Sequence, residues 1–172
     1  MMQLITEAYR DQNRQLHEVN AAYGTSGAKW REKTRRMSDW GRLPILDYGA
    51  GKATLAKSLG PAYRVTNYDP CIHGFDGEPL PHPVVVVGDV MEHVEPDLVD
   101  FVLSHIRSLT QQTALFVINC QPSKKTLPDG RNTHICLHPP DWWENKIVGA
   151  GFAIREKGGN EVETWLICSP ST

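Results

Sequence analysis

One stretch of the sequence, Ile45–Thr54, restricts the folds open to this chain more than any other. It reads ILDYGAGKAT, an apolar run followed by two closely spaced glycines and a helix-favouring segment. Glycines in such a turn let the backbone approach a ligand, and the N–H groups that open the helix attract its polar groups. Asp69 follows Asp47 by 22 residues, where an acidic side chain can accept hydrogen bonds from ribose hydroxyls. The pattern predicts a nucleotide-type site at the ends of two parallel strands.

The remaining pattern predicts one α/β domain over residues 1–172, with an N-terminal helical lid in residues 1–40. We expect lid helices at about Gln3–Val19 and Ala28–Trp40. Apolar runs predict strands at residues 43–48, 64–68, 83–87, 114–119, 153–156 and 161–167. Further helices are expected at residues 52–59, 96–109 and 139–148. This alternation favours a doubly wound, mostly parallel sheet that closes with an antiparallel C-terminal hairpin.

Composition removes several classes of protein from consideration. The net charge of −2 gives no whole-molecule reason to expect nucleic-acid binding, which is therefore the less favoured partner. The four cysteines lie far apart with no CxxC pair, which indicates reduced thiols. No apolar run approaches the roughly 18 residues of a membrane span, and the N-terminus does not resemble a signal peptide. We expect a cytoplasmic protein with no membrane partner.

The Asp47-x-Gly49-x-Gly51 turn and Asp69 give the chain a recognisable likeness. The sequence resembles small, Rossmann-like class I S-adenosylmethionine-dependent methyltransferases of the type 11 and type 12 kind, whose first motif reads D-x-G-x-G-x-G. An NAD fingerprint fits poorly because its third glycine would be Thr54. The resemblance implies a Rossmann-like core over residues 43–169. It departs at Ala53, where the family often has a glycine, and after Asp69, where the usual third strand is expected to be short or missing.

The resemblance implies S-adenosylmethionine as the cofactor. Gly49, Ala50 and Gly51 would pass beneath its methionine part, and Asp69 would hold the ribose. Asp47 would order the turn or reach the cofactor's amino group through water. The family also implies that Pro70, Cys71 and Ile72 form a wall for the adenine, and that Asp89 and Val90 lie near the sulfonium. Tyr23 and Trp30 would cover the carboxylate end of the cofactor. A plain turn and a packing tryptophan remain equal alternatives for the cover.

Gly88–Val94 gathers three ionisable side chains where a parallel strand is expected to end. It resembles the D-V-L-E-H segment of many small-molecule methyltransferases. It is also similar to the E-x-x-E-H segment of two metal-using branches, the ubiquinone-biosynthesis O-methyltransferases and the small-RNA 3′-terminal 2′-O-methyltransferases. That second likeness implies a divalent cation, Mg²⁺ or Mn²⁺, on Asp89, Glu92, His93 and His134. The alternative is a solvated turn before the next helix.

The polar loop at residues 121–138 is long enough to suggest a working segment. In the family this region lies over the acceptor, which makes Arg131 and Asn132 candidate substrate contacts. His134 or His138 would be the general base, and Glu92 and His93 are the other candidate catalytic groups. The run HPPDWW that begins at His138 looks like a motif of amino-methylating DNA enzymes, but it falls in the wrong place, so its tryptophans are expected to pack.

These observations predict a methyltransferase that transfers a methyl group to an oxygen of a small molecule or nucleotide. Oxygen is favoured because a hydroxyl must lose its proton, which the polar groups near Glu92 and His134 can accept. Two alternatives stay open. One is an S-adenosylmethionine-binding module or inactive partner subunit, and the other is a nucleic-acid methyltransferase. Compact members of the family also occur in phage genomes.

Overall fold

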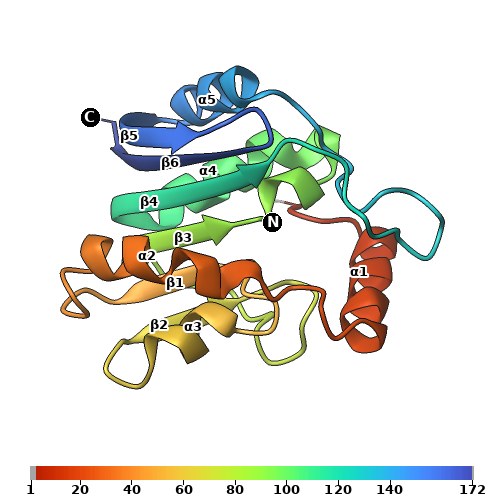
Figure 1. Cartoon of the computed structure of the whole chain (residues 1–172), viewed down its shortest axis with the longest axis horizontal. Coiled ribbons are helices and arrows are strands. Elements are labelled where there is room, and N and C mark those ends of the chain that lie inside the picture. Colours follow the sequence, from red (N-terminus) through yellow and green to blue (C-terminus); the bar gives the residue numbers. More distant parts are fainter. Residues whose placement is uncertain (1–2, 172) are drawn as a thin grey trace.

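A six-stranded sheet organises the computed structural model, which describes residues 3–171 (Figure 1). The strand order is β2-β1-β3-β4-β6-β5. Neighbours among β1 to β4 pair in parallel, whereas β6 is antiparallel to both β4 and β5. The strand bounds are β1 Ile45–Tyr48, β2 Val65–Tyr68, β3 His82–Gly88, β4 Thr110–Asn119, β5 Phe152–Gly159 and β6 Glu163–Pro170. The predicted parallel sheet and C-terminal hairpin are confirmed.

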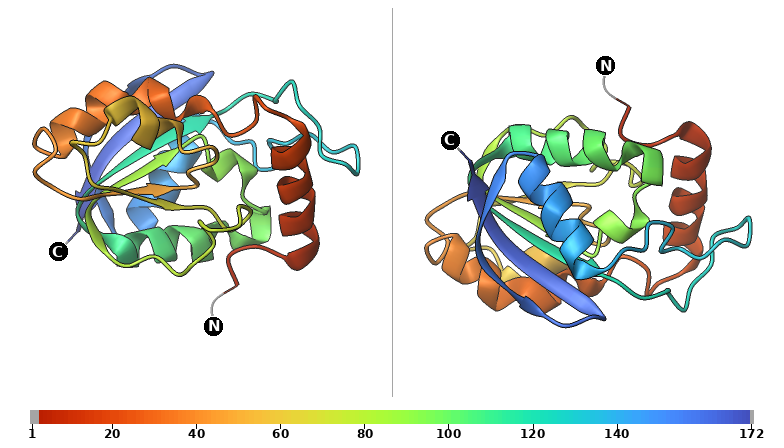
Figure 2. Two further views of the ribbon diagram at one scale, coloured as in Figure 1. Left: turned by 90° about the horizontal axis from the view of Figure 1, so that it is seen from below. Right: turned by 90° about the horizontal axis from the view of Figure 1, so that it is seen from above.

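Helices cover both faces of the sheet and one of its ends (Figures 1 and 2). Helices α4 and α5 pack on one face, and η1, α2 and α3 pack on the other. Helix α1 stands at the end of the sheet, beside the loop that follows β4 (Figure 2). The bounds are α1 Glu7–Val19, η1 Ser26–Trp30, α2 Arg31–Met37, α3 Thr54–Leu59, η2 Met91–His93, η3 Pro96–Leu98, α4 Val99–Leu109 and α5 Pro140–Gly149, where η marks a 3₁₀ helix.

The four valines of β3 show why this strand lies at the centre. Val84 and Val86 join the apolar cluster beneath η1 and α3, whereas Val85 and Val87 join the cluster beneath α4 and α5. All four are almost fully buried, as expected for a strand covered on both faces. The central strands therefore hold their carboxyl ends in fixed positions along one edge.

The expected loss of a third strand is also confirmed. The segment that joins β2 to β3, residues 69–81, contains turns and bends but no strand, within the described part of the chain. β2 is therefore an edge strand next to β1. In addition, residues 3–171 include no helix that is both long and apolar enough to cross a membrane.

Two element boundaries differ from the sequence expectation because of left-handed backbone. The second lid helix, expected to reach Trp40, ends at Met37, and the φ angles of Asp39 and Trp40 are +47° and +54°. The helix expected from Lys52 begins at Thr54, since Ala53 has φ +55°. Such angles are incompatible with an α-helix.

Candidate functional site

A cavity of about 400 Å³ lies where the carboxyl ends of β1 to β4 meet the lid. Parallel strands commonly place ligand sites at this edge. The cavity is lined by residues that follow each of the strands β1, β2, β3 and β4. Residues of α1 and of the turn before η1 also line it. The lining includes Tyr9, Tyr23, Gly24, Lys29, Gly49, Gly51, Asp69, Pro70, Cys71, Asp89, Val90, Glu92, His93, Glu95, Ser123, Lys125 and His134.

The glycine turn after β1 is held against both β2 and the lid. The Gly49 and Ala50 amides donate to the Tyr68 carbonyl at 2.8 and 3.0 Å. Gly49 and Gly51 have φ angles of +78° and +53°, which favour glycine. A Cβ on Gly51 would lie 2.5 Å from the Gly24 carbonyl oxygen. The Gly24 backbone of the lid therefore packs directly on the glycine turn, and this close packing requires a residue without a side chain at position 51.

Asp69 links the turns that follow β1 and β2. Its buried carboxylate accepts from the Gly51 amide and from the Cys71 amide, both at 2.9 Å. A carboxylate oxygen accepts more than one hydrogen bond, so Asp69 retains capacity for ligand hydroxyls. Pro70 and Cys71 line the cavity beside it. Asp69, Pro70 and Cys71 are thus brought together with the glycine turn, whereas Ile72, the third residue predicted for the adenine wall, is not part of the described cavity lining.

Three other predicted cofactor residues lie behind the turn rather than on the main cavity. Asp47, Ala50 and Trp30 line a second cavity of about 30 Å³. Asp89 lines both cavities. Burial raises the pKa of Asp47 to about 7, and the nearby Asp69 adds to the rise. The Asp47 carboxyl is therefore a buried group that loses its proton with difficulty.

This raised pKa predicts how stability depends on pH. The folded protein holds the Asp47 proton up to about pH 7, whereas an ordinary aspartate loses it near 3.8. The wild type therefore loses stability as pH rises from about 4 to 7, with no further loss above that. Asp47→Asn removes this loss, so its advantage in melting temperature is expected to grow between pH 4 and 7 and then level off. The exposed Asp97→Asn is the control, and thermal denaturation showing the same trend for both variants would contradict the assignment.

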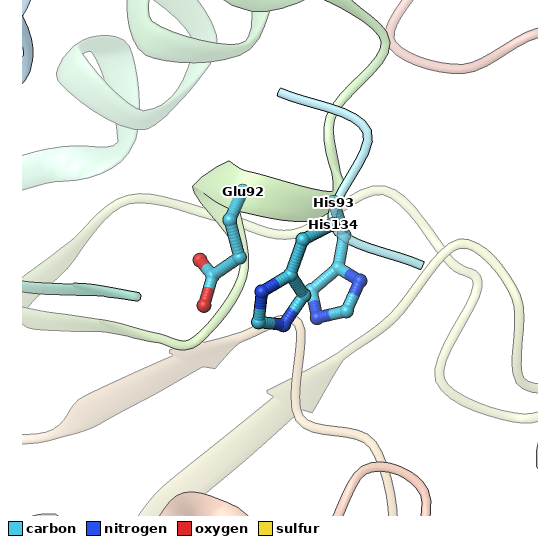
Figure 3. Close-up of side chains that lie close together, drawn as sticks. All are labelled: Glu92, His93 and His134. Carbon is cyan, nitrogen blue, oxygen red and sulfur yellow. The ribbon is translucent and has the colours of Figure 1, made fainter. Parts of the chain in front are cut away.

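Glu92, His93 and His134 form one cluster in the cavity wall (Figure 3). One side-chain ligand atom from each lies within 4.8 Å of the others. The His93 Nδ1 is 2.8 Å from the Thr133 carbonyl oxygen, and the His134 Nδ1 is 2.6 Å from that of Gln121. Because a carbonyl only accepts, both Nδ1 atoms carry a proton, so Nε2 is the nitrogen with a lone pair whenever either imidazole is neutral. Asp89, the fourth predicted ligand, is not part of this cluster.

Burial sets the protonation of two cluster members. Glu92 is fully buried, which raises its pKa well above the ordinary value, and Asp89 adds to the rise. Burial, followed by the neighbouring His134, lowers the pKa of His93 to about 3. Glu92 Oε1 accepts from the Asn119 amide at 3.1 Å, whereas Oε2 has no partner among the described residues. The cluster thus joins a carboxyl group that resists ionisation to at least one neutral imidazole, that of His93.

The other predicted residues of the long loop do not reach the cavity. Arg131 is exposed and pairs with Asp129, and Asn132 bonds to both backbone groups of Ser123 within the loop. His138 stacks on Trp142, with ring centroids 3.6 Å apart. None of these three belongs to the described cavity lining. Trp143 is fully buried in the core, as expected for a packing residue.

The lid contributes contacts that sequence reasoning missed. The Thr6 amide and hydroxyl donate to the two oxygens of Glu95 at 2.8 and 2.7 Å. The Tyr9 hydroxyl donates to the His93 carbonyl at 2.6 Å. Lys29 of the lid and Lys125 of the loop after β4 also line the cavity. Thr6 before a predicted helix is a recognisable cap, but nothing local points to a partner 89 residues away.

Several solved structures share this architecture. The 1,6-didemethyltoxoflavin N1-methyltransferase of Burkholderia thailandensis, with S-adenosylhomocysteine bound, matches at TM-score 0.68 and 16% identity over 96% of this chain and 88% of that one. The chain has the class I S-adenosylmethionine methyltransferase fold. The CcbJ methyltransferase of Streptomyces caelestis matches at TM-score 0.63 and 12% identity, over 95% of this chain and 98% of that one.

A third structure extends the likeness. The magnesium protoporphyrin IX methyltransferase of Synechocystis, again with S-adenosylhomocysteine bound, gives TM-score 0.59 and 16% identity, over 98% of this chain and 90% of that one. No family model and no curated protein matches the sequence. At these identities the likeness concerns the fold, so residue roles depend on the cavity itself.

Proposed function

We propose that this protein is an S-adenosylmethionine-dependent methyltransferase that transfers a methyl group to an oxygen of a small acceptor. The observation that carries the proposal is the composition of one cavity. The glycine turn and Asp69 lie at the β1 and β2 ends, and the cluster of Glu92, His93 and His134 lies at the β3 and β4 ends. The neighbours solved with S-adenosylhomocysteine support the choice of cofactor.

The β1 and β2 ends fit such a cofactor. Asp69 is positioned to accept from ribose hydroxyls, and Pro70 and Cys71 beside it offer a wall for the purine. The Gly49–Gly51 turn leaves space for the chain that joins ribose to amino acid. When bound, S-adenosylmethionine supplies an electrophilic methyl group. Since this cavity of about 400 Å³ must hold the cofactor as well, a small acceptor, including a nucleotide, fits better than a duplex.

The β3 and β4 ends fit an acceptor that must lose a proton. The Nε2 atoms of His93 and His134 carry lone pairs, and their Nδ1 atoms are anchored to backbone carbonyls. A neutral imidazole within reach of a hydroxyl removes its proton as general base. The protein otherwise needs to hold the acceptor oxygen in line with the methyl group. Both tasks fall to residues of the same cavity wall.

The same cluster has the donor set of a divalent cation site. One imidazole nitrogen from each histidine and a carboxyl oxygen of Glu92 form a mixed nitrogen and oxygen set. Each imidazole donates its other N–H to a backbone carbonyl, as metal-binding histidines commonly do. The unpartnered Oε2 of Glu92 completes the fit. Mg²⁺ or Mn²⁺ held by these residues would lower the pKa of an acceptor hydroxyl. We assign this site to Glu92, His93 and His134, without Asp89.

Calorimetry with S-adenosylhomocysteine tests the cofactor. The wild type is expected to bind, and Asp69→Ala to bind roughly 10- to 100-fold more weakly, because charge-assisted hydrogen bonds are worth about 1.5–3 kcal/mol each. Asp76→Ala is the matched control, since Asp76 caps Gly74 in the same inter-strand segment but is exposed and outside the cavity lining. A wild type that binds no S-adenosylhomocysteine would overturn the proposed function.

A further inference from the structure

Three buried polar atoms behind the glycine turn have no hydrogen-bond partner among residues 3–171. They are the Trp30 Nε1, the Asp47 Oδ2 and the Asp89 Oδ1. Trp30 and Asp47 are only 7% and 5% exposed. All three residues line the same cavity of about 30 Å³. Buried polar groups are nearly always paired, so three unpaired ones around one small space indicate a shared ligand.

The chemistry of the three groups selects the kind of ligand. An indole N–H only donates, whereas carboxylate oxygens accept. A metal ion or an ammonium group would suit the two aspartates but would leave the Trp30 N–H without an acceptor. A water molecule accepts one bond from Trp30 and donates one to each aspartate. The small cavity is large enough to admit a water molecule, and buried waters typically make about three hydrogen bonds.

The place of this cavity connects it to the cofactor. Gly24, Gly49 and Asp89 line both the small cavity and the main one. Trp30 packs against the end of β3, since a Cβ on Gly88 would lie 2.8 Å from its Cδ1. Asp89 follows directly with φ +55°, a conformation that costs an ordinary residue energy and is often found at functional sites. Trp30 is therefore placed to hold Asp89 from behind.

We propose that Trp30 is a positioning residue for the amino-acid end of the cofactor. Through one water shared with Asp47 and Asp89, its indole N–H fixes the Asp89 carboxylate toward the cofactor's α-ammonium group. The role goes beyond packing, because it depends on the N–H and not on the ring. The inference rests on the proposed function, since it requires a cofactor with an amino-acid tail.

Two ligands separate this role from a structural one. S-adenosylhomocysteine has the amino-acid tail, and 5′-methylthioadenosine lacks it. Trp30→Phe keeps an aromatic ring against Gly88 and removes the N–H. Calorimetry is expected to show roughly tenfold weaker binding of S-adenosylhomocysteine, the effect of one lost hydrogen bond, with binding of 5′-methylthioadenosine unchanged. Trp165→Phe is the matched control, because Trp165 packs against the same apolar cluster but lines neither cavity. It is expected to change neither affinity.

The outcomes divide clearly. Equal loss for both ligands, or no loss for either, would show that Trp30 only packs and would overturn the inference. A wild type that binds neither ligand would instead contradict the proposed function. Should Trp30→Phe fail to fold, benzothienylalanine at position 30 keeps the fused ring and lacks the N–H. The same selective loss is expected from it, and its absence would again overturn the role.

Discussion

Gly51→Ala is expected to lower affinity for S-adenosylhomocysteine by at least tenfold. The new Cβ would lie 2.5 Å from the Gly24 carbonyl oxygen and 2.8 Å from the Gly24 Cα. Both contacts are with backbone, so the lid turn or the glycine turn must move. The φ angle of +53° adds a strain of about 1–2 kcal/mol for a residue with a side chain. Since the Gly51 amide also donates to Asp69, a shift of the glycine turn would displace the carboxylate that is proposed to bind the ribose.

Gly130→Ala separates the clash from the strain. Gly130 has φ +87°, and a Cβ there would meet nothing within 4 Å. It lies in the loop after β4, outside the described cavity lining. Calorimetry should therefore show affinity close to wild type for Gly130→Ala, even if its melting temperature falls. Wild-type affinity in Gly51→Ala would contradict the close contact between lid and glycine turn.

The glycine turn was predictable because its requirements are local. A short apolar strand, two positive φ angles and a following helix can be read from adjacent residues, and Gly49 and Gly51 supply the angles. Ala53 shows the limit of that reasoning. It adopts φ +55° where the family often has glycine, so surrounding contacts hold a conformation that the residue itself disfavours. The missing third strand was equally accessible, since the short chain segment between Asp69 and the valine-rich strand leaves little room for one.

Contacts between distant segments were not predictable from local pattern. Trp30 was predicted either to cover the cofactor or to serve as a packing tryptophan, and local pattern could not show that it lies against Gly88 behind the turn. The hydrogen bonds from Thr6 to Glu95 depend on how α1 packs against the rest of the domain, and a periodic sequence pattern does not predict that packing. Asp89 was expected beside Glu92 as a metal ligand. It instead has φ +55° immediately after β3 and is left out of the cluster.

The two loop histidines show most clearly what tertiary structure adds. His134 and His138 lie four residues apart and have the same chemistry, so both were candidate bases. In the folded chain, His134 Nδ1 bonds to the Gln121 carbonyl and its ring meets His93 with centroids 4.8 Å apart. His138 stacks on Trp142. The difference makes them a matched pair for testing the cluster.

Titration with Mn²⁺ alone is expected to distinguish this pair by a large factor. His134→Ala should weaken Mn²⁺ binding at least about 100-fold, because losing a ligand costs no less than the 10- to 100-fold typical of outer-shell changes. His138→Ala should bind as the wild type does, since its ring lies outside the cluster of Glu92, His93 and His134. Electron paramagnetic resonance of free Mn²⁺ gives the affinities without requiring a known acceptor. S-adenosylhomocysteine should still bind to His134→Ala, because Asp69 and the glycine turn are unchanged. Equal Mn²⁺ affinity in the two variants, or none in the wild type, would rule out the cation site and leave the imidazole pair as the general base.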